Sequence, residues 1–427
     1  MSTRFIYIAA VLHFISSFSF VDRDSQQSEA ALTSVLLVAR VIPVFCAMFL
    51  CLAAVPLRHY GLLFRELLRS PLVWWLWYAV VATTSGFANG IEPIWSAWKC
   101  TEIVGVLIWA AAVSVHLTLT NDKQLLEKCY QALFYSSYAV CAWAMLTVVQ
   151  GDLGWRAYLY ESRRLNMDWP HINSITLGTL AMFCMLGCFI RVKPGQLRLA
   201  IIMAVLPSLV FVMARSRTPL LGLCLLGVIA ILSTNMSRSY KLVFPCLLFA
   251  IAVGALVSPD FRTRLRIESP QEIQSGSGRI RTKSGAESAW AESIRAIEKQ
   301  PLIGYGYLNA KRFIKDKDRS VDNGALQALL SAGFIGATPL IIYVPILGWM
   351  WLLGTRTRRE LSQQTRRLAA FGLIAYSLAV AKSMTTNSLS GSGFPLLLLL
   401  LSSYSLRITR VESQMHPSIP STADIPV

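Results

Sequence analysis

The chain has 427 residues, of which 54% are hydrophobic and 15% are charged, and its formal net charge is +17. Soluble domains carry about 25% charged residues, so this composition excludes a soluble multidomain enzyme, and the apolar content excludes a disordered chain. Excess positive charge on a soluble protein would favour nucleic acid as a partner. Basic residues also accumulate in the cytoplasmic loops of membrane proteins, so we expect a membrane protein with no nucleic-acid partner.

Apolar segments of membrane-spanning length recur along most of the chain. The first, at 5–21, lacks a small-residue cleavage site and is expected to be a retained span, not a signal peptide. The pattern predicts an all-α, polytopic integral membrane protein of about 12 transmembrane helices with one large extracytoplasmic loop. The spans are expected at 5–21, 33–56, 71–87, 99–119, 130–149, 172–190, 197–213, 218–234, 241–258, 325–353, 367–387 and 394–408.

These spans divide the chain into four regions. Residues 1–258 hold the first nine helices, 259–324 form the large loop, and 325–410 hold the last three helices. Residues 411–427 contain three prolines and several serines, so we expect a disordered tail.

Basic residues are frequent in every second short loop and rare in the loops between them. By the positive-inside rule, both termini are expected to be cytoplasmic and the loop 259–324 to lie outside. The basic residues of the loops expected inside are Arg58, Arg65, Arg69, Arg191, Lys193, Arg198, Arg238, Lys241, Arg356, Arg358, Arg359, Arg366 and Arg367.

The large loop has a structured second half. Residues 287–299 read as a short amphipathic helix with Trp290, Ile294 and Ile297 on one side. Pro301 is expected to end this helix, and the glycines that follow it are expected to form a turn.

Ionisable side chains are expected to gather near the outer face. Those inside spans are Arg40, Lys99, Glu102 and Lys382, and each falls in the outer half of its helix. Arg215 and Arg217 occupy a short outer turn, and the outer loop 150–171 adds further arginines, aromatic residues and His171. Guanidinium groups bind phosphate in a bidentate fork, so this arrangement suits a phosphate-bearing ligand. The alternatives are snorkelling of the arginines and an interfacial aromatic belt.

Four short motifs occur in a characteristic order over about 165–340. They are Pro170-His-Ile-Asn173, Arg217-Thr-Pro-Leu-Leu221, Pro301-Leu-Ile-Gly-Tyr-Gly306 with a following Phe313, and Asn323 followed by nine residues and Gly333-Phe-Ile-Gly336. Together they resemble the bacterial O-antigen ligase and glycan polymerase family of membrane proteins.

Two positions depart from that family's pattern. The family has a histidine where this chain has Asp322. The family's Gly-Arg pair before the loop tryptophan appears as Gly285-Ala286, and Arg279 or Arg281 would replace the arginine if residues have been inserted.

The resemblance implies an enzyme of the bacterial inner membrane that needs no metal or other cofactor. Such an enzyme transfers a glycan from undecaprenyl diphosphate, among the membrane lipids, to a hydroxyl acceptor on the outer face. The acceptor would be the lipid A-core in a ligase or the growing polysaccharide in a polymerase, and the sequence leaves this open.

The resemblance also assigns roles to residues. Asp322 becomes the candidate catalytic base, with His171 as the reserve candidate, although Asp322 could instead only cap the tenth span. Candidate substrate-binding residues are Arg215, Arg217, Arg279, Arg281, Asn323, Arg40 and Lys382.

A different class remains as an alternative, namely a lipid-linked glycan flippase or secondary transporter. Such proteins often contain internal repeats and place charges near the bilayer midplane. This chain has no evident repeat, and its charges fall in the outer half of the spans. A scaffold protein would not explain the structured loop or the arginine turn.

Overall fold

The structure is a computed structural model, and its described part is helical apart from short connections and an isolated antiparallel bridge between Met167 and Ile172. The described residues are 2–17, 35–69, 71–89, 93–120, 122–150, 165, 167, 172–191, 196–214, 216, 218–232, 283–307, 323–355, 361–385 and 393–415. The expected all-α membrane fold is confirmed in this part of the chain.

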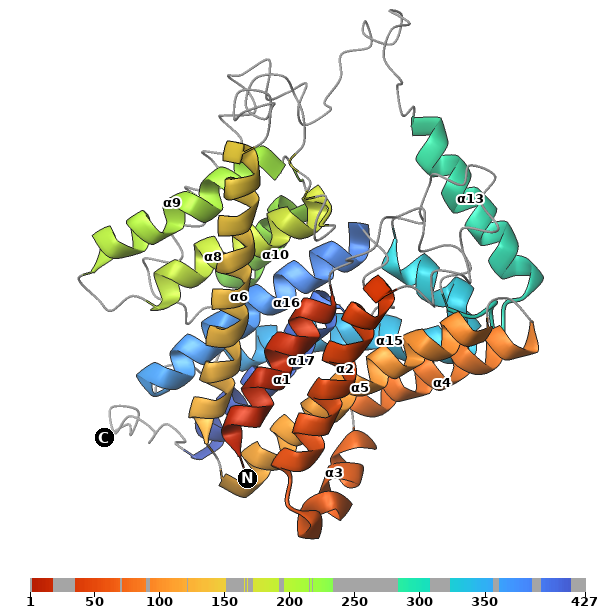
Figure 1. Cartoon of the computed structure of the whole chain (residues 1–427), viewed down its shortest axis with the longest axis horizontal. Coiled ribbons are helices and arrows are strands. Elements are labelled where there is room, and N and C mark those ends of the chain that lie inside the picture. Colours follow the sequence, from red (N-terminus) through yellow and green to blue (C-terminus); the bar gives the residue numbers. More distant parts are fainter. Residues whose placement is uncertain are drawn as a thin grey trace, which may run out of the picture.

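The helices follow the expected order (Figure 1). They are α1 (Thr3–Ser16), α2 (Val35–Ala54), η3 (Leu57–His59), α3 (Tyr60–Leu67), α4 (Leu72–Ala88), α5 (Pro93–Thr120), α6 (Lys123–Gln150), α8 (Ser174–Arg191), α9 (Leu197–Ala214), α10 (Thr218–Leu232), α13 (Lys283–Lys299), α15 (Gly324–Thr355), α16 (Gln363–Thr385) and α17 (Phe394–Met415).

Among the described residues, 7 helices are long and apolar enough to cross a membrane, or up to 8 if α2 and the segment after it form one span with a 95° bend. The helices α1, α4 and α10 are apolar but shorter. The expected span at 241–258 lies outside the described residues. The chain is therefore a multi-pass membrane protein, and the number of twelve spans stays a prediction.

Contacts between helix termini define two ends of the bundle. At the first, which we call the basal end, Lys123 at the start of α6 pairs with Glu412 near the end of α17 and bonds Thr365 of α16. At the other, which we call the loop end, the segment Pro301–Tyr307 contacts the end of α4 and the start of α5. Figure 1 shows α1 beginning on the side of the bundle opposite α13.

The interior is closely packed, and several of its polar groups are bonded across helices. The indole of Trp351 in α15 donates to Ser402 Oγ at 2.8 Å, and Tyr404 donates to the Ala110 carbonyl at 2.7 Å. A Cβ added to Gly372 of α16 would lie 2.7 Å from Trp351, so a glycine is required where these helices touch. In hydrocarbon such bonds replace those that water would make, which explains the polar side chains of the core.

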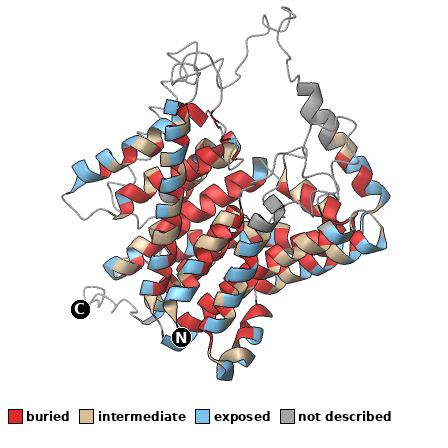
Figure 2. Ribbon diagram, viewed as in Figure 1, coloured by how far each residue is buried: buried red, intermediate tan, exposed pale blue. Residues whose placement is uncertain are grey.

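Many large apolar side chains lie on the outside of the bundle, where Figure 2 shows exposed residues on the outward faces of the helices. Phe49, Val149 and Trp349 are exposed, although each lies on a helix whose other face is packed. A water-soluble protein rarely exposes contiguous apolar surface of this kind. These faces fit contact with lipid chains.

The helix α13 begins at Lys283, four residues before the start predicted from the sequence. The helix exists and ends at Lys299, before Pro301, as expected. Ile297 is buried with Ser293 and Ala296, but Ile294 is 46% exposed. Residues three apart lie about 60° apart around a helix, so the packed face is centred on Ala296 and Ile297 and leaves Ile294 at its edge. The side chain of Trp290 lies outside the described residues.

The distribution of charge over the two ends predicts the orientation. Arginines gather at the basal end, which is therefore expected to face the cytoplasm. They are Arg58, Arg65, Arg69, Arg191, Arg198, Arg366, Arg367, Arg407 and Arg410. In a cysteine-free variant, a cysteine at Ser275 should react with an impermeant reagent added from the periplasmic side. Reaction only after access from the cytoplasmic side would contradict this orientation.

Candidate functional site

The helix α15 is broken at Gly333, near its loop end. Gly333 has φ 59° and ψ −167°, a conformation that essentially only glycine adopts. In an unbroken helix, the amides of Phe334 and Ile335 would bond the carbonyls of Leu330 and Ser331. The break removes both bonds. Pro339 and Pro345 also lie in α15, but the departure from helical geometry is at Gly333.

The segment Pro301–Tyr307 supplies the missing partners. The amides of Tyr305 and Gly306 donate to the carbonyls of Leu330 and Ser331 at 2.7 and 2.9 Å. In the other direction, the amides of Phe334 and Ile335 donate to the carbonyls of Pro301 and Leu302 at 2.7 and 3.1 Å. All four backbone groups released by the break are thus bonded by this segment, as burial in an apolar bundle requires.

Two glycines allow the backbones to approach this closely. Gly304 has φ +68°, and a Cβ there would lie 2.6 Å from Gly333 N and from the Leu330 carbonyl oxygen. A Cβ on Gly333 would lie 2.3 Å from the carbonyl group of Leu302. The motifs at 301–306 and 333–336, which are far apart in the sequence, therefore form one structural unit, and neither glycine can be replaced without moving the backbone.

The same segment is tied to α4 and α5. Ser85 Oγ and Asn89 Nδ2 donate to the Gly304 carbonyl at 2.6 and 3.1 Å. The Tyr307 amide donates to Ser96 Oγ at 3.2 Å. Tyr305 donates from its hydroxyl to the Ala296 carbonyl at 2.9 Å, and burial raises its pKa, so it remains a neutral donor. Four helices are thereby joined at the loop end.

Replacing Gly333 by alanine is expected to lower the free energy of unfolding by about 3 kcal/mol or more. About 1–3 kcal/mol comes from backbone strain, and the disturbed hydrogen bonds add about 1 kcal/mol each. Thermal unfolding and limited proteolysis of the purified protein would measure the loss. Gly61→Ala is the control, because no atom lies within 4 Å of its added Cβ and alanine favours a helix. Unchanged melting of Gly333→Ala would show that the unit is not rigid.

A second set of polar residues lies where α8, α10 and α16 meet at the loop end. Asn173 caps α8 by accepting from the Thr176 amide at 2.8 Å. Lys382 of α16 is buried and donates to Thr176 Oγ1 at 2.9 Å. A Cβ on Gly178 would lie 3.0 Å from the Ser216 side chain, so the turn between α9 and α10 rests directly on α8.

The packing of α10 against α16 places Lys382 level with that turn. A Cβ on Gly222 would lie 2.9 Å from Leu378, which fixes one point of contact between the two antiparallel helices. Thr218 on α10 and Lys382 on α16 each lie one helical turn from this point, in the direction of the loop end. The charge of Lys382 therefore stands at the level where the turn containing Arg215 and Arg217 enters α10.

The structure describes only some of the predicted site residues. Asn323 caps α15, because its Oδ1 accepts from the amides of Ala325 and Leu326 at 2.9 and 3.1 Å. Arg40 lies on α2, in the half nearer the loop end, and its side chain is not described. The remaining predicted residues lie outside the described residues, and these are Asp322, His171, Arg215, Arg217, Arg279 and Arg281.

Lys99 and Glu102 of α5 form an ion pair with each other. Lys99 Nζ lies 2.8 Å from Glu102 Oε2, and both side chains are buried. The pair lies just beyond Ser96, which bonds the Pro301–Tyr307 segment. An ion pair of this kind lowers the cost of burying either charge.

Sequence reasoning missed a polar group at the basal end. Glu66 is 3% exposed, bonds Arg69 at 2.7 Å and accepts from Ser114 at 2.5 Å. It lies beside a cavity lined by none of the predicted site residues. Arg69 is a neighbour in the sequence, but Ser114 and Arg407 come from α5 and α17, so no spacing in the sequence identifies them as partners of Glu66. In the described part of the chain, no group of three His, Cys, Asp or Glu side chains could hold a metal ion.

Comparison with known families identifies a matching region in this chain. The family model described as O-antigen ligase matches residues 202–341, from α9 to the middle of α15. This confirms the resemblance recognised in the sequence. The matched region contains the turn between α9 and α10, the Pro301–Tyr307 segment and the break at Gly333, and it leaves out Pro170–Asn173 and Lys382. No curated protein and no solved structure matches the chain.

Proposed function

Because residues 202–341 form an O-antigen ligase domain in a multi-pass membrane protein, we propose that this chain transfers a glycan from undecaprenyl diphosphate to a hydroxyl acceptor. The reaction would take place at the loop end, on the outer face of the bacterial inner membrane. The family match is the observation that carries this proposal, since it spans the arginine turn, the large loop and the start of α15.

The chemistry of the donor explains the positive charge of the proposed site. A diphosphate leaving group takes up negative charge as the glycosidic bond breaks, and fixed cations stabilise that charge. Arg215, Arg217 and Lys382 would bind the diphosphate, with Arg40 and either Arg279 or Arg281 as further partners. The level of Lys382 beside the α10 turn supports this grouping, and no metal is needed when cations of the protein do this work.

The acceptor hydroxyl must lose a proton in the reaction. We assign this role to Asp322, with His171 as the alternative base. The support for Asp322 is its place directly before Asn323, which caps α15. A base at that position would directly precede a helix that is held by the Pro301–Tyr307 segment. Asn323 would contact the acceptor or the glycan.

The direct test is an assay of the purified chain in liposomes without added metal. Undecaprenyl diphosphate carrying a labelled glycan is supplied with either lipid A-core or free polysaccharide as the acceptor. Transfer to lipid A-core indicates a ligase, and elongation of the polysaccharide indicates a polymerase. No transfer to either acceptor, together with movement of the lipid-linked glycan across the bilayer, would favour a flippase.

A further inference from the structure

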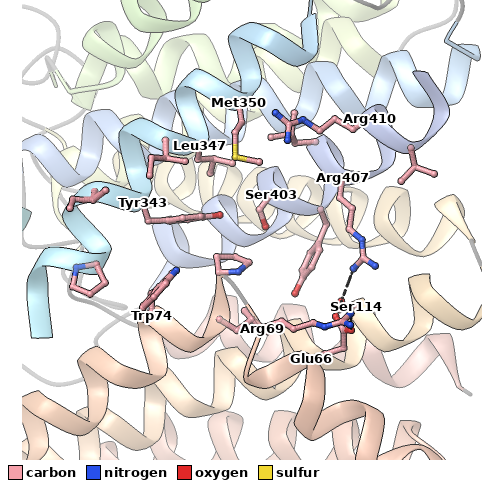
Figure 3. Close-up of a pocket in the computed structure, with 18 of the residues that line it drawn as sticks. Glu66, Arg69, Trp74, Ser114, Tyr343, Leu347, Met350, Ser403, Arg407 and Arg410 are labelled. Carbon is pink, nitrogen blue, oxygen red and sulfur yellow. Dashed lines mark hydrogen bonds and ion pairs between the residues drawn. The ribbon is translucent and has the colours of Figure 1, made fainter. Parts of the chain in front are cut away.

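A cavity of about 840 Å³ lies at the basal end, away from the proposed reaction site (Figure 3). Helices α3, α4, α5, α15 and α17 surround it. In Figure 3 its two sides differ, with Trp74 and Tyr343 on one side and Arg407 and Arg410 on the other. The cavity is therefore both apolar and charged, and the two kinds of lining are separated in space.

The apolar wall comes from the second half of α15. Ile342 and Ile346 line the cavity and are also exposed at the surface of the bundle, while Leu347, which follows Ile346, is buried. Trp74 at the start of α4 is likewise exposed and lines the cavity on the same side as Tyr343 (Figure 3). Because these side chains belong both to the cavity and to the lipid-facing surface, the cavity opens sideways towards the acyl chains of the bilayer.

The charged wall is built around the buried carboxylate of Glu66. Arg69 bonds this carboxylate at 2.7 Å, and Arg407 Nη1 lies 3.8 Å from it and donates to Ser114 Oγ at 3.1 Å. The side chains of Arg69 and Arg407 are nevertheless 46% and 45% exposed. Their guanidinium groups are therefore oriented by Glu66 and Ser114 while remaining accessible from the cavity.

Arg410 adds a third guanidinium to this wall. It lines the cavity one turn from Arg407 on α17, and within the described ranges its side chain has no hydrogen-bond or ion-pair partner. The cavity wall thus carries three arginines and one carboxylate, which leaves a surplus of two positive charges. That surplus suits a phosphodiester with further polar oxygens, held at the edge of an apolar groove.

We propose that this cavity binds one anionic glycerophospholipid from the basal leaflet. The phosphate would contact Arg407 and Arg410, and an acyl chain would lie along Ile342 and Ile346 of α15. Basic pockets between membrane helices are suited to anionic headgroups, and the apolar wall distinguishes a lipid from a soluble anion. The lipid would fill the space between α15 and α17 and hold these helices apart at a fixed distance.

Native mass spectrometry of the purified full chain tests the proposal. The protein is given equal amounts of phosphatidylglycerol and phosphatidylcholine with the same acyl chains. One phosphatidylglycerol should be retained in preference to phosphatidylcholine. Arg410→Gln should lower this preference about fivefold, the usual contribution of one basic residue near an anionic lipid surface. Arg410 is chosen because it takes no part in the Glu66 network, so its loss should leave the fold intact.

Two further variants distinguish binding of a lipid in the cavity from a general attraction between basic residues and anionic lipids. Arg198→Gln removes an exposed positive charge of the basal end that does not line the cavity, and it should leave the preference unchanged. Ile346→Trp should reduce retention of both lipids, because it fills the apolar wall. Equal retention of the two lipids by the unaltered chain would overturn the proposal, and so would equal losses in Arg198→Gln and Arg410→Gln. Displacement by inorganic phosphate alone, or stronger retention of undecaprenyl phosphate, would also overturn it.

Discussion

Replacing Asp322 by asparagine is expected to slow glycan transfer by about 10²–10⁴-fold with little change in stability. The substitution keeps the size of the side chain and removes the basic oxygen, and general-base catalysis contributes an effect of this size. The measurement is the transfer rate of the purified variant with lipid-linked glycan, alongside its melting temperature.

The capping of α15 makes this test decisive. Among the described residues, the cap comes from Asn323, whose Oδ1 accepts from two amides of the first turn. Asn323→Ala should therefore lower the free energy of unfolding by about 1 kcal/mol, whereas Asp322→Asn should not. Asp122→Asn is the matched control at the basal end, since Asp122 caps α6 by accepting from the Gln124 amide at 2.8 Å. It should retain full transfer activity.

The pH dependence of transfer identifies the base independently. The base must be deprotonated, so the rate should fall as the pH drops through its pKa. The rate should decrease near pH 4 if the base is a carboxylate and near pH 6.5 if it is a histidine. Burial of the carboxylate would raise its pKa and move this decrease to a higher pH. A fall near 6.5, an active Asp322→Asn and an inactive His171→Ala together would assign the role to His171.

Replacing Arg217 by lysine is expected to lower kcat/KM for the lipid-linked donor by about 10–100-fold. Lysine keeps the charge but loses the two parallel donors of the fork, and hydrogen bonds to a charged group contribute about 1.5–3 kcal/mol. Arg217→Ala should lose more activity. The variants should remain folded, because Ser216 and Thr218 on either side keep the packing of the turn against α8.

The control for this substitution is Arg198→Lys, which makes the same change on the exposed start of α9 at the basal end. It should leave the kinetics unchanged. Full activity of both Arg217→Lys and Arg217→Ala would remove Arg217 from the donor site. A loss that appears only in KM would indicate that Arg217 binds the donor without stabilising the leaving group.

The sequence was a good guide where the signal is local. Hydropathy located most of the apolar helices, and Pro301 marked the end of α13. The start of α15 lies where it was expected, but the sequence offered Asp322 as its possible cap, whereas the cap among the described residues comes from Asn323. The sequence was a poor guide to packing faces, as Ile294 illustrates. The two isoleucines of α13 are equally apolar, and only the position of Leu330 on α15 decides which of them is buried.

The break in α15 could not be derived from the sequence. The prolines at 339 and 345 were the visible irregularities, yet the departure from helical geometry is at Gly333. That conformation depends on hydrogen bonds to a segment about thirty residues earlier in the chain. The network around Glu66 is similar, because Ser114 and Arg407 become its partners only when α3, α5 and α17 are packed together.

The way in which Pro301–Tyr307 is bound to α15 also bears on how the protein can change in evolution. The stretch from 308 to 322 begins and ends at sites held by the same helix, through Tyr305 and through Asn323. Closing a longer connection between fixed ends costs only about 0.6 kcal/mol for each doubling of its length. An insertion inside Pro301–Tyr307 would instead shift the bonds of residues 301 and 302 out of register with those of residues 305 and 306. Homologous chains can therefore vary in length after Tyr307, while the seven residues from Pro301 to Tyr307 keep a fixed spacing.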